Sequence, residues 1–253
     1  MSDLHQIHPQ APVGVEAEVI DLGLRSYMLG IYNKVGLGLL LAASAAYATA
    51  HVPALRDLMF STTTPADGVT ITALTILGSV VAFAPLFLLL CCGSILSKPT
   101  PLRTAALYWS VVALVGASLG VLFLTFSGGS IAMTLAVSAI GFGGLSLIGY
   151  QTRKDLTAFG SFLVMGLVGL VLVLAANLFL HSPALDYATG IVGVLIFAGL
   201  IAFDTQRLKL AYHQLGGDEA SLAVATDLGA LSLFINFVNL FQFLLMMMSG
   251  QRR

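Results

Sequence analysis

Hydrophobic and polar positions follow one another along this chain in long blocks rather than in a fine alternation. Apolar runs of about 20 residues are bounded by charged residues, prolines or glycine clusters. About 20 residues at the helical rise cover a bilayer hydrocarbon core of roughly 30 Å, so each run can form a membrane helix. The predicted spans are residues 28–50, 70–92, 104–126, 131–150, 157–180, 186–206 and 222–249.

These runs predict an all-α, polytopic membrane protein, a bundle of seven transmembrane helices. Short connections favour antiparallel packing of consecutive helices. We expect two parts, a polar cytoplasmic tail at residues 1–27 and a transmembrane domain at residues 28–250. The tail contains acids, prolines and histidines before any long apolar run, unlike a cleaved signal peptide. The lipid bilayer is therefore the first predicted partner.

Composition supports this interpretation and excludes several function classes. Hydrophobic residues make up 58% of the chain and charged residues 9%, against about a quarter charged in ordinary soluble domains. The net charge is -1 and the cations are scattered, so no nucleic-acid partner is expected. Cys91 and Cys92 are adjacent, a spacing that predicts neither a disulfide nor a zinc site. Common catalytic motifs are missing, so we expect no enzyme activity and no cofactor.

Charged residues in the loops predict the orientation. Cytoplasmic loops of membrane proteins carry an excess of Lys and Arg. With the N-terminus in the cytoplasm and the C-terminus outside, only Arg56, Arg252 and Arg253 lie on the outer side and eight cations lie on the inner side. The rule therefore favours this orientation. The two terminal arginines oppose the rule and leave open a last segment that re-enters without crossing. The cations then on the inner side are Arg25, Lys34, Lys98, Arg103, Arg153, Lys154, Arg207 and Lys209.

Asp204 is the first candidate functional residue, because ionisable groups deep in a membrane span are costly. It follows about eighteen uncharged residues and precedes Arg207 by three positions. It could serve in an ion pathway, or it could simply pair with Arg207 or Lys209 at the membrane interface. From the residues alone the two interpretations are equally acceptable.

The last span carries a polar stripe in an otherwise apolar helix. Asn236, Asn239 and Gln242 recur at three-residue spacing, and such a stripe should face protein or water rather than lipid. This predicts that the last helix is central in the bundle. Asn239 and Gln242 could equally be hydrogen-bonding groups between helices with no role in transport.

Other polar and small residues in the spans favour structural roles. Asp227 is expected to cap the last helix, and Lys34 to extend its amine to the inner interface. Pro85 should kink the second span. Small residues at 36–38, 116–120 and 141–144 predict close packing within one molecule.

Four stretches resemble the Bax inhibitor-1-like family, also called the transmembrane Bax inhibitor motif family. GLIAFDTQRLK, ending at Lys209, resembles the sixth-span signature of that family. The other three are SYMLGIYNKVGLGLLL at 26–41, YQTRKDLTAFGSFLVMGLVGL at 150–170 and ALSLFINFVNLFQFLL at 230–245. The resemblance runs from about residue 25 to residue 250.

The resemblance implies six helices wrapped around a central last helix. It also implies a pH-sensitive leak of Ca²⁺ controlled by two aspartates, one in the sixth span and one in the seventh. Asp204 matches the first, but Asn236 stands where the second would be. Two carboxylates share a proton, whereas an ionised carboxylate can accept a hydrogen bond from an amide. The expected gate is therefore Asp204 with Asn236, supported by Asn239, Gln242 and Arg207.

Two functions from different classes follow. The first is a low-conductance leak for Ca²⁺ or another cation in the inner (plasma) membrane, with an altered pH response. Asp204 would then be a weak Ca²⁺ ligand, since a hard cation needs several oxygen ligands. The second is a regulator that conducts no ions and binds other membrane proteins, such as a membrane-bound protease.

Overall fold

The structure is a computed structural model that describes residues 13–63, 71–93 and 97–250, most of them helical. The tail expected at residues 1–27 lies partly outside this range, and α1 already begins at Val13. The elements are α1 (Val13–His51), α2 (Pro53–Met59), β1 (Phe60–Thr63), β2 (Ile71–Leu74), α3 (Ile76–Cys91), α5 (Pro101–Ser118), α6 (Gly120–Thr125), α7 (Gly128–Gln151), α8 (Thr157–Leu180), α9 (Pro183–Gln214) and α10 (Glu219–Gly250).

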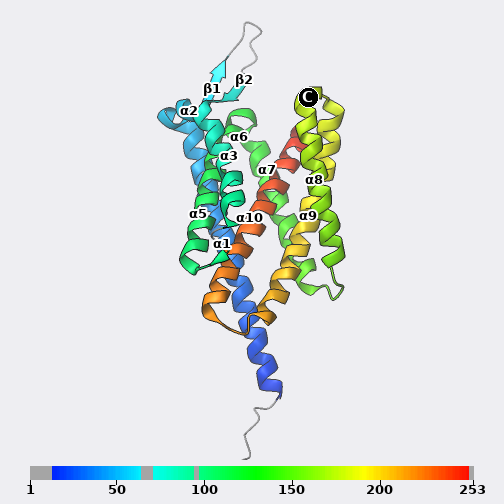
Figure 1. Cartoon of the computed structure of the whole chain (residues 1–253). Coiled ribbons are helices and arrows are strands. Elements are labelled where there is room, and N and C mark those ends of the chain that lie inside the picture. The colour runs from blue at the N-terminus through cyan, green and yellow to red at the C-terminus, as the bar shows by residue number, and fades with distance from the viewer. Residues whose placement is uncertain (1–12, 64–70, 94–96, 251–253) are drawn as a thin grey trace, which may run out of the picture.

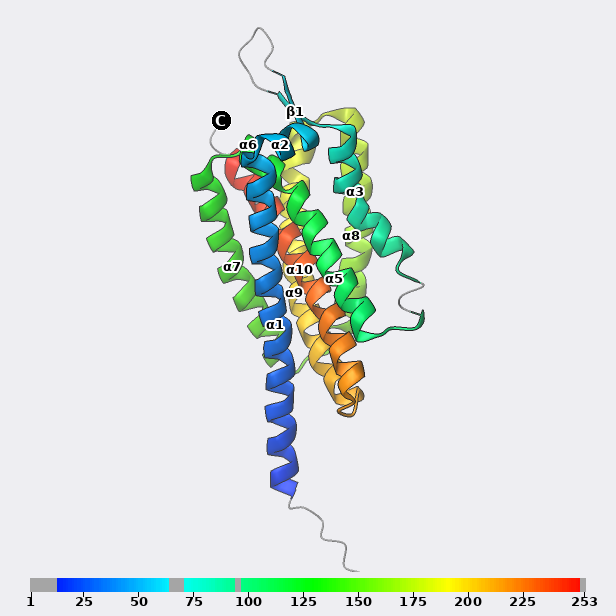
Figure 2. The ribbon, with the colours of Figure 1, turned by 90° about the vertical axis from the view of Figure 1, so that its left-hand side faces the viewer.

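The long helices run side by side as a bundle (Figures 1 and 2). In the part of the chain that the structure describes, six helical segments are long and apolar enough to cross a membrane. Large apolar side chains on them are exposed, as expected for surfaces that face lipid. The six segments are Leu22–His51, Pro101–Thr125, Gly128–Gln151, Thr157–Leu180, Pro183–Gln214 and Glu219–Met248.

The span predicted at residues 70–92 begins too early. Ile71–Leu74 is a strand, and it pairs antiparallel with Phe60–Thr63 in a two-stranded hairpin. β-branched Thr and Ile residues fit extended backbone well, so this apolar stretch supports a strand rather than a helical turn. The helix begins at Ile76, where the side chain of Thr75 accepts a hydrogen bond of 3.0 Å from the backbone N–H of Gly78.

The remaining helix of this region, α3, is short. Its 16 residues give a length of about 24 Å, less than a hydrocarbon core of roughly 30 Å. Pro85 lies inside it, and the helix changes direction along its length (Figure 2). α3 packs against α5, so the two form a pair at one side of the bundle.

Helix α10 packs against α1, α5, α7 and α9 and is the most buried of the six candidate spans. It contributes to two apolar clusters. Phe234 lies in the cluster shared with α1 and α5, and Phe243 lies in the cluster shared with α8 and α9. α10 is one unbroken helix of 32 residues, and because it contributes to both clusters, it joins the two halves of the bundle.

Only some of the predicted small-residue faces pack closely. A Cβ on Gly116 would overlap the backbone of Ala42, and one on Gly120 would overlap Thr49. The α1–α5 contact is therefore intramolecular, as expected. At Gly36 and throughout 141–144, by contrast, the glycine positions face open space.

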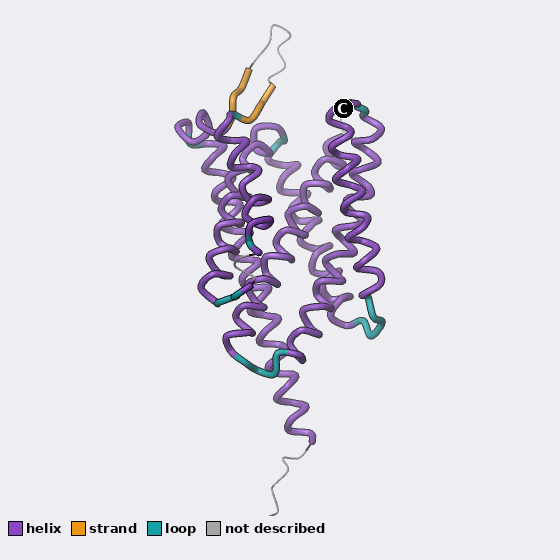
Figure 3. Tube along the Cα trace, viewed as in Figure 1, coloured by secondary structure: helices purple, strands orange, loops and turns teal. Residues whose placement is uncertain are grey.

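The connections gather at two opposite ends of the bundle (Figure 3). The β hairpin lies at one end. The α7–α8 and α9–α10 loops and the start of α5 lie at the other, toward which the N-terminal part of α1 extends. Six of the cations predicted to be cytoplasmic belong to the N-terminal half of α1, these loops or the helix segments beside them, Lys98 lies just before α5, and Lys34 lies near the middle of α1.

Candidate functional site

Asp204 lies within α9 and is buried, with 5% of its surface exposed. The helix continues beyond it to Gln214, whereas the predicted span ended at residue 206. Asp204 is thus nearly three turns from the end of its helix rather than at the end itself. Its carboxylate faces α10, the helix that packs most extensively against α9.

Two side chains of α10 donate hydrogen bonds to one oxygen of this carboxylate. Asn236 Nδ2 lies 2.8 Å from Asp204 Oδ2, and the hydroxyl of Ser232 donates to the same atom. Ser232 and Asn236 are four positions apart, so they lie on one face of α10. The hydrogen bond expected between Asn236 and Asp204 is present, and Ser232 is a partner that the sequence analysis did not identify.

The other carboxylate oxygen is paired with a cation on its own helix. Arg207 Nη2 lies 3.2 Å from Asp204 Oδ1, and the Arg207 side chain is 56% exposed. The expected pairing at three-residue spacing is therefore present. Lys209, the other candidate partner, instead donates to the carbonyl oxygen of Tyr150 at 3.0 Å.

The rest of the predicted polar stripe does not reach Asp204. Asn239 is half-buried and donates to the carbonyl oxygen of Ile235 on its own helix, at 2.8 Å. Gln242 is also half-buried, and its side chain has no hydrogen-bond partner among the described residues. The structure thus brings together Asp204, Asn236 and Arg207 and leaves Asn239 and Gln242 apart.

The arrangement can hold α9 against α10 through the single carboxylate of Asp204. The described side chains that contact the Asp204 carboxylate are all hydrogen-bond donors. The residue at position 204 must therefore supply an acceptor. No group of three or more His, Cys, Asp or Glu side chains among the described residues could hold a metal ion. A cation passing Asp204 would have to replace one of these donors.

A second buried charge pair lies between α1 and α10. Lys34 forms an ion pair with Asp227, whose side chain is only 4% exposed. Thr104 of α5 donates to the other oxygen of Asp227 at 2.7 Å, and the hydroxyl of Tyr108 donates to the carbonyl oxygen of Lys34 at 2.6 Å. One carboxylate therefore connects three helices.

This pair corrects two predictions from the sequence. Asp227 does not cap α10, because the helix begins two turns earlier, at Glu219. Lys34 does not extend to the interface, because its amine is turned toward Asp227. The two residues are 193 positions apart. The one sequence signal for their pairing is that each is a charged residue within an apolar segment.

Gln206 joins two of the four stretches that carried the family resemblance. Its Nε2 donates to the carbonyl oxygen of Lys154 at 2.7 Å, and its Oε1 accepts from the N–H of Leu156 at 2.9 Å. The side chain is buried. It therefore fixes the backbone of the α7–α8 connection against α9.

Two acids in the connecting loops show shifted pKa values. Hydrogen bonds from the side chain and backbone of Thr157 lower the pKa of Asp155. Hydrogen bonds from Ser221, first from its side chain and then from its backbone, lower the pKa of Asp218. The Ser221 N–H lies 2.8 Å from Asp218 Oδ2, as expected of a residue that caps the start of α10.

Comparison with known proteins gives a family and several relatives. Residues 24–253 match the family described as "Inhibitor of apoptosis-promoting Bax1". An uncharacterized protein of Caulobacter vibrioides is 55% identical over 92% of each chain. Inner membrane protein YbhL of Escherichia coli K12 is 36% identical over 91% of this chain and 94% of its own. The matches cover nearly the entire chain, including α9, α10 and the loop held by Gln206.

Proposed function

The chain belongs to the Bax inhibitor-1-like family of integral membrane proteins, and on this premise we propose a low-conductance leak for Ca²⁺ or another cation, gated at Asp204 and Asn236. The observation that carries the proposal is the buried Asp204 carboxylate between α9 and α10. An ionisable group deep in a bundle marks an ion pathway when its partners can be exchanged. The proposed function involves no catalytic step and no bound cofactor.

The proposed topology has seven crossings, with the N-terminus in the cytoplasm, the C-terminus outside and α10 at the centre. Six long apolar helices and the shorter α3 supply the crossings. The cations near one end of the bundle support this orientation, and the contacts of α10 with four helices support its central place. The name of the E. coli relative supports an inner-membrane location.

The proposed closed state is the one seen here. Ser232 and Asn236 hold the carboxylate of Asp204, and Arg207 screens it from the polar end of the bundle. Opening would separate α9 from α10 at this level and expose the carboxylate oxygens to a hydrated cation. One carboxylate with amide and hydroxyl oxygens binds Ca²⁺ weakly, which suits transient passage. Asn239 and Gln242, on the same helix, are proposed as supporting polar groups along the path.

The proposed pH response is shifted or weak. A pair of carboxylates must share a proton at this distance, and its ionisation is coupled. The amide of Asn236 does not titrate, and it donates directly to the carboxylate of Asp204. The hydrogen bond therefore forms without any protonation step.

A second candidate function is a non-conducting regulator that binds other membrane proteins, such as a membrane-bound protease. Two observations favour it. Both oxygens of the Asp204 carboxylate have partners within the bundle. In addition, neither Asp204 nor Asn236 lines the three cavities described in this structure. If the Asp204 carboxylate never leaves these partners, it serves only to hold α9 and α10 together.

The decisive experiment measures Ca²⁺ entry into lipid vesicles that contain the purified full chain, from pH 5 to pH 8. The leak predicts flux above that of empty vesicles, and a changed flux in Asp204→Asn. Asp57→Asn, a change at an exposed acid outside the bundle, is the matched control and should retain wild-type flux. The absence of flux in every variant, with a membrane protease co-purifying and changing its activity, would establish the regulator instead.

A further inference from the structure

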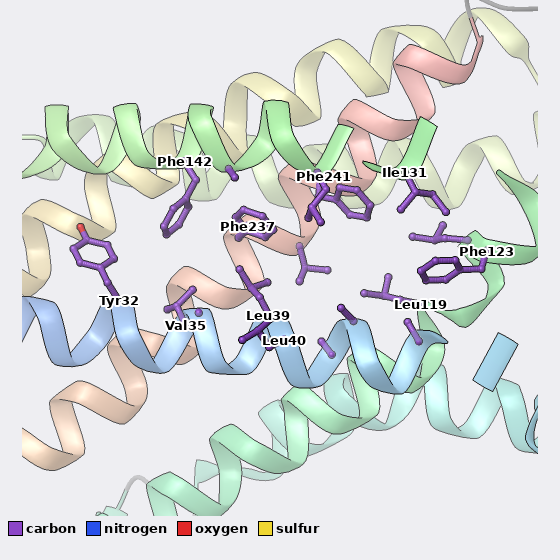
Figure 4. Close-up of a pocket in the computed structure, with 18 residues that line it drawn as sticks. Tyr32, Val35, Leu39, Leu40, Leu119, Phe123, Ile131, Phe142, Phe237 and Phe241 are labelled. Carbon is purple, nitrogen blue, oxygen red and sulfur yellow. The ribbon is translucent and has the colours of Figure 1, made fainter. Parts of the chain in front are cut away.

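An apolar cavity of about 430 Å³ lies between α1 and α7, with α10 as its floor (Figure 4). Leu39 and Ala43 of α1 line it from one side, Leu135 and Phe142 of α7 from the other, and Phe237 from α10. The side chains point toward one another across a gap between the two helices. Leu122 and Phe123 of α6, together with Leu119 just before this helix, close one end.

This cavity faces the hydrocarbon depth of the bilayer. Most of its lining residues belong to two candidate membrane spans, Leu22–His51 and Gly128–Gln151, and others belong to α10 and to the end of the span Pro101–Thr125. Leu40 and Leu135, on its two rims, are 67% and 43% exposed. An apolar cavity does not hold water, and leaving it empty forfeits dispersion contacts. The occupant available at this depth is a lipid acyl chain.

A second cavity, of about 440 Å³, continues the first toward the N-terminal end of α1. The two cavities share Tyr32 and Phe142, whose rings meet edge to face with their centroids 6.3 Å apart. We call the two cavities together the α1–α7 groove. The second cavity adds polar groups to the apolar lining of the first.

Two of these polar groups lack partners among the described residues. Arg25 lines the cavity, its side chain is exposed, and no described acid pairs with it. Ser146 also lines the cavity and is only 5% exposed, yet its hydroxyl has no hydrogen-bond partner in the described part of the chain. A buried hydroxyl without a partner is costly. A rotation about its Cα–Cβ bond would turn the hydroxyl toward the cavity, where a ligand oxygen would satisfy it.

Further cations lie near this end of the groove, together with one exposed acid, Asp155. Tyr150 lines the second cavity, and its carbonyl oxygen and ring are contacted by Lys209. Arg153 and Lys154 are exposed in the loop that follows. Basic pockets between membrane helices on the headgroup side suit anionic lipids.

We propose that the α1–α7 groove binds one anionic phospholipid from the leaflet on the N-terminal side. One acyl chain occupies the apolar cavity beside Leu39 and Phe237. The phosphate lies at Arg25, and the hydroxyl of Ser146 donates to a phosphate or ester oxygen. The bound lipid fills the gap between α1 and α7 and stabilises this side of the bundle. The site is separate from Asp204 and does not depend on ion flux.

The test is native mass spectrometry of the purified full chain in detergent, titrated with phosphatidylglycerol or with phosphatidylcholine of identical acyl chains. The proposal predicts one phosphatidylglycerol bound more tightly than phosphatidylcholine. Arg25→Gln should weaken phosphatidylglycerol binding about fivefold, the contribution of one cation near a lipid surface, and leave phosphatidylcholine unchanged. Arg103→Gln, a change at an exposed arginine outside the groove, should leave both unchanged.

A second set of variants blocks the groove itself. Gly36 and Gly143 line the two cavities, and a Cβ at either meets open space, so Gly36→Leu and Gly143→Leu should fold and exclude the lipid. Gly141→Leu, also at an open position but outside the groove, is the control. Equal binding of the two lipids, retained binding in both blocked variants, or an equal loss in Gly141→Leu would overturn the proposal.

Discussion

Asn236 of α10 donates a hydrogen bond of 2.8 Å to the buried carboxylate of Asp204 on α9. These residues are 32 positions apart and lie on the two helices that share the most extensive contact in the bundle. An amide and a carboxylate form this contact with one donor and one acceptor. The bond therefore depends on the chemical identity of both side chains, and substitution of either one tests it.

Asn236→Asp should give the leak a stronger pH dependence. Two carboxylates at this distance cannot both ionise without repulsion, so they bind and release a proton as a pair. The measurement is Ca²⁺ flux into vesicles from pH 5 to pH 8. Gln214→Glu is the control, because it adds a carboxylate at the exposed end of α9, ten positions beyond Asp204, and it should retain the wild-type profile. Identical profiles for Asn236→Asp and wild type would contradict the proposed gate.

Lys34→Met should destabilise the bundle by about 3 to 5 kcal/mol, because it leaves the buried Asp227 carboxylate without its cation. The double variant Lys34→Met with Asp227→Leu should be more stable than the single one, because no charge remains buried. The free energy of unfolding in detergent checks both. Arg56→Met, which breaks an exposed pair with Asp57, should cost less than about 1 kcal/mol. Equal losses for Lys34→Met and Arg56→Met would show that the buried pair has no special role.

Gly116→Ala should destabilise the protein by about 1 to 3 kcal/mol, the usual cost of overpacking. The added methyl group would overlap the backbone of Ala42 and force α1 away from α5. Gly144→Ala, at an open position, should be neutral or stabilising, since Ala favours helix over Gly. The thermal midpoints of the two variants in detergent decide the matter, and a stable Gly116→Ala would mean that this contact is loose.

Gln206→Ala should loosen the α7–α8 connection. The substitution removes both hydrogen bonds to the backbone of this loop, at Lys154 and Leu156. Trypsin cleaves after exposed cations, so cleavage after Arg153 or Lys154 should become faster, while cleavage after Arg103 should keep its wild-type rate. An unchanged cleavage pattern would indicate that the loop is held by other contacts.

Asp218 should contribute stability that depends on pH. Its pKa in the folded protein lies below the ordinary value of 3.8, so the ionised cap stabilises the folded state above that value. This contribution is lost as the pH falls through the lowered folded pKa. The difference in thermal midpoint between wild type and Asp218→Ala should therefore shrink in strong acid. Asp218→Asn should retain a cap without this pH dependence, and a constant difference between wild type and Asp218→Ala would refute the assignment.

The amino-acid sequence by itself determined the membrane character, most of the helices and the family. Length and apolarity decide whether a segment can cross a bilayer, and both can be counted along the chain. The sequence also indicated Asp204, because a carboxylate in an apolar run is conspicuous, and the motif match brought Asn236 to the same site. The strand at Ile71–Leu74 was missed because a short apolar stretch of β-branched residues fits either a strand or a helix end.

Only the tertiary structure decided which polar groups meet. Lys34 and Asp227 lie on the first and last helices, and nothing in local spacing reveals that α1 and α10 bring them into contact. The same is true of Ser232 at Asp204 and of the α1–α7 groove, which exists because both helices pack on α10 and leave a gap between them. Spacing along a helix fixes which residues share a face, but the partner of that face depends on how helices pack, which involves residues far apart in the chain.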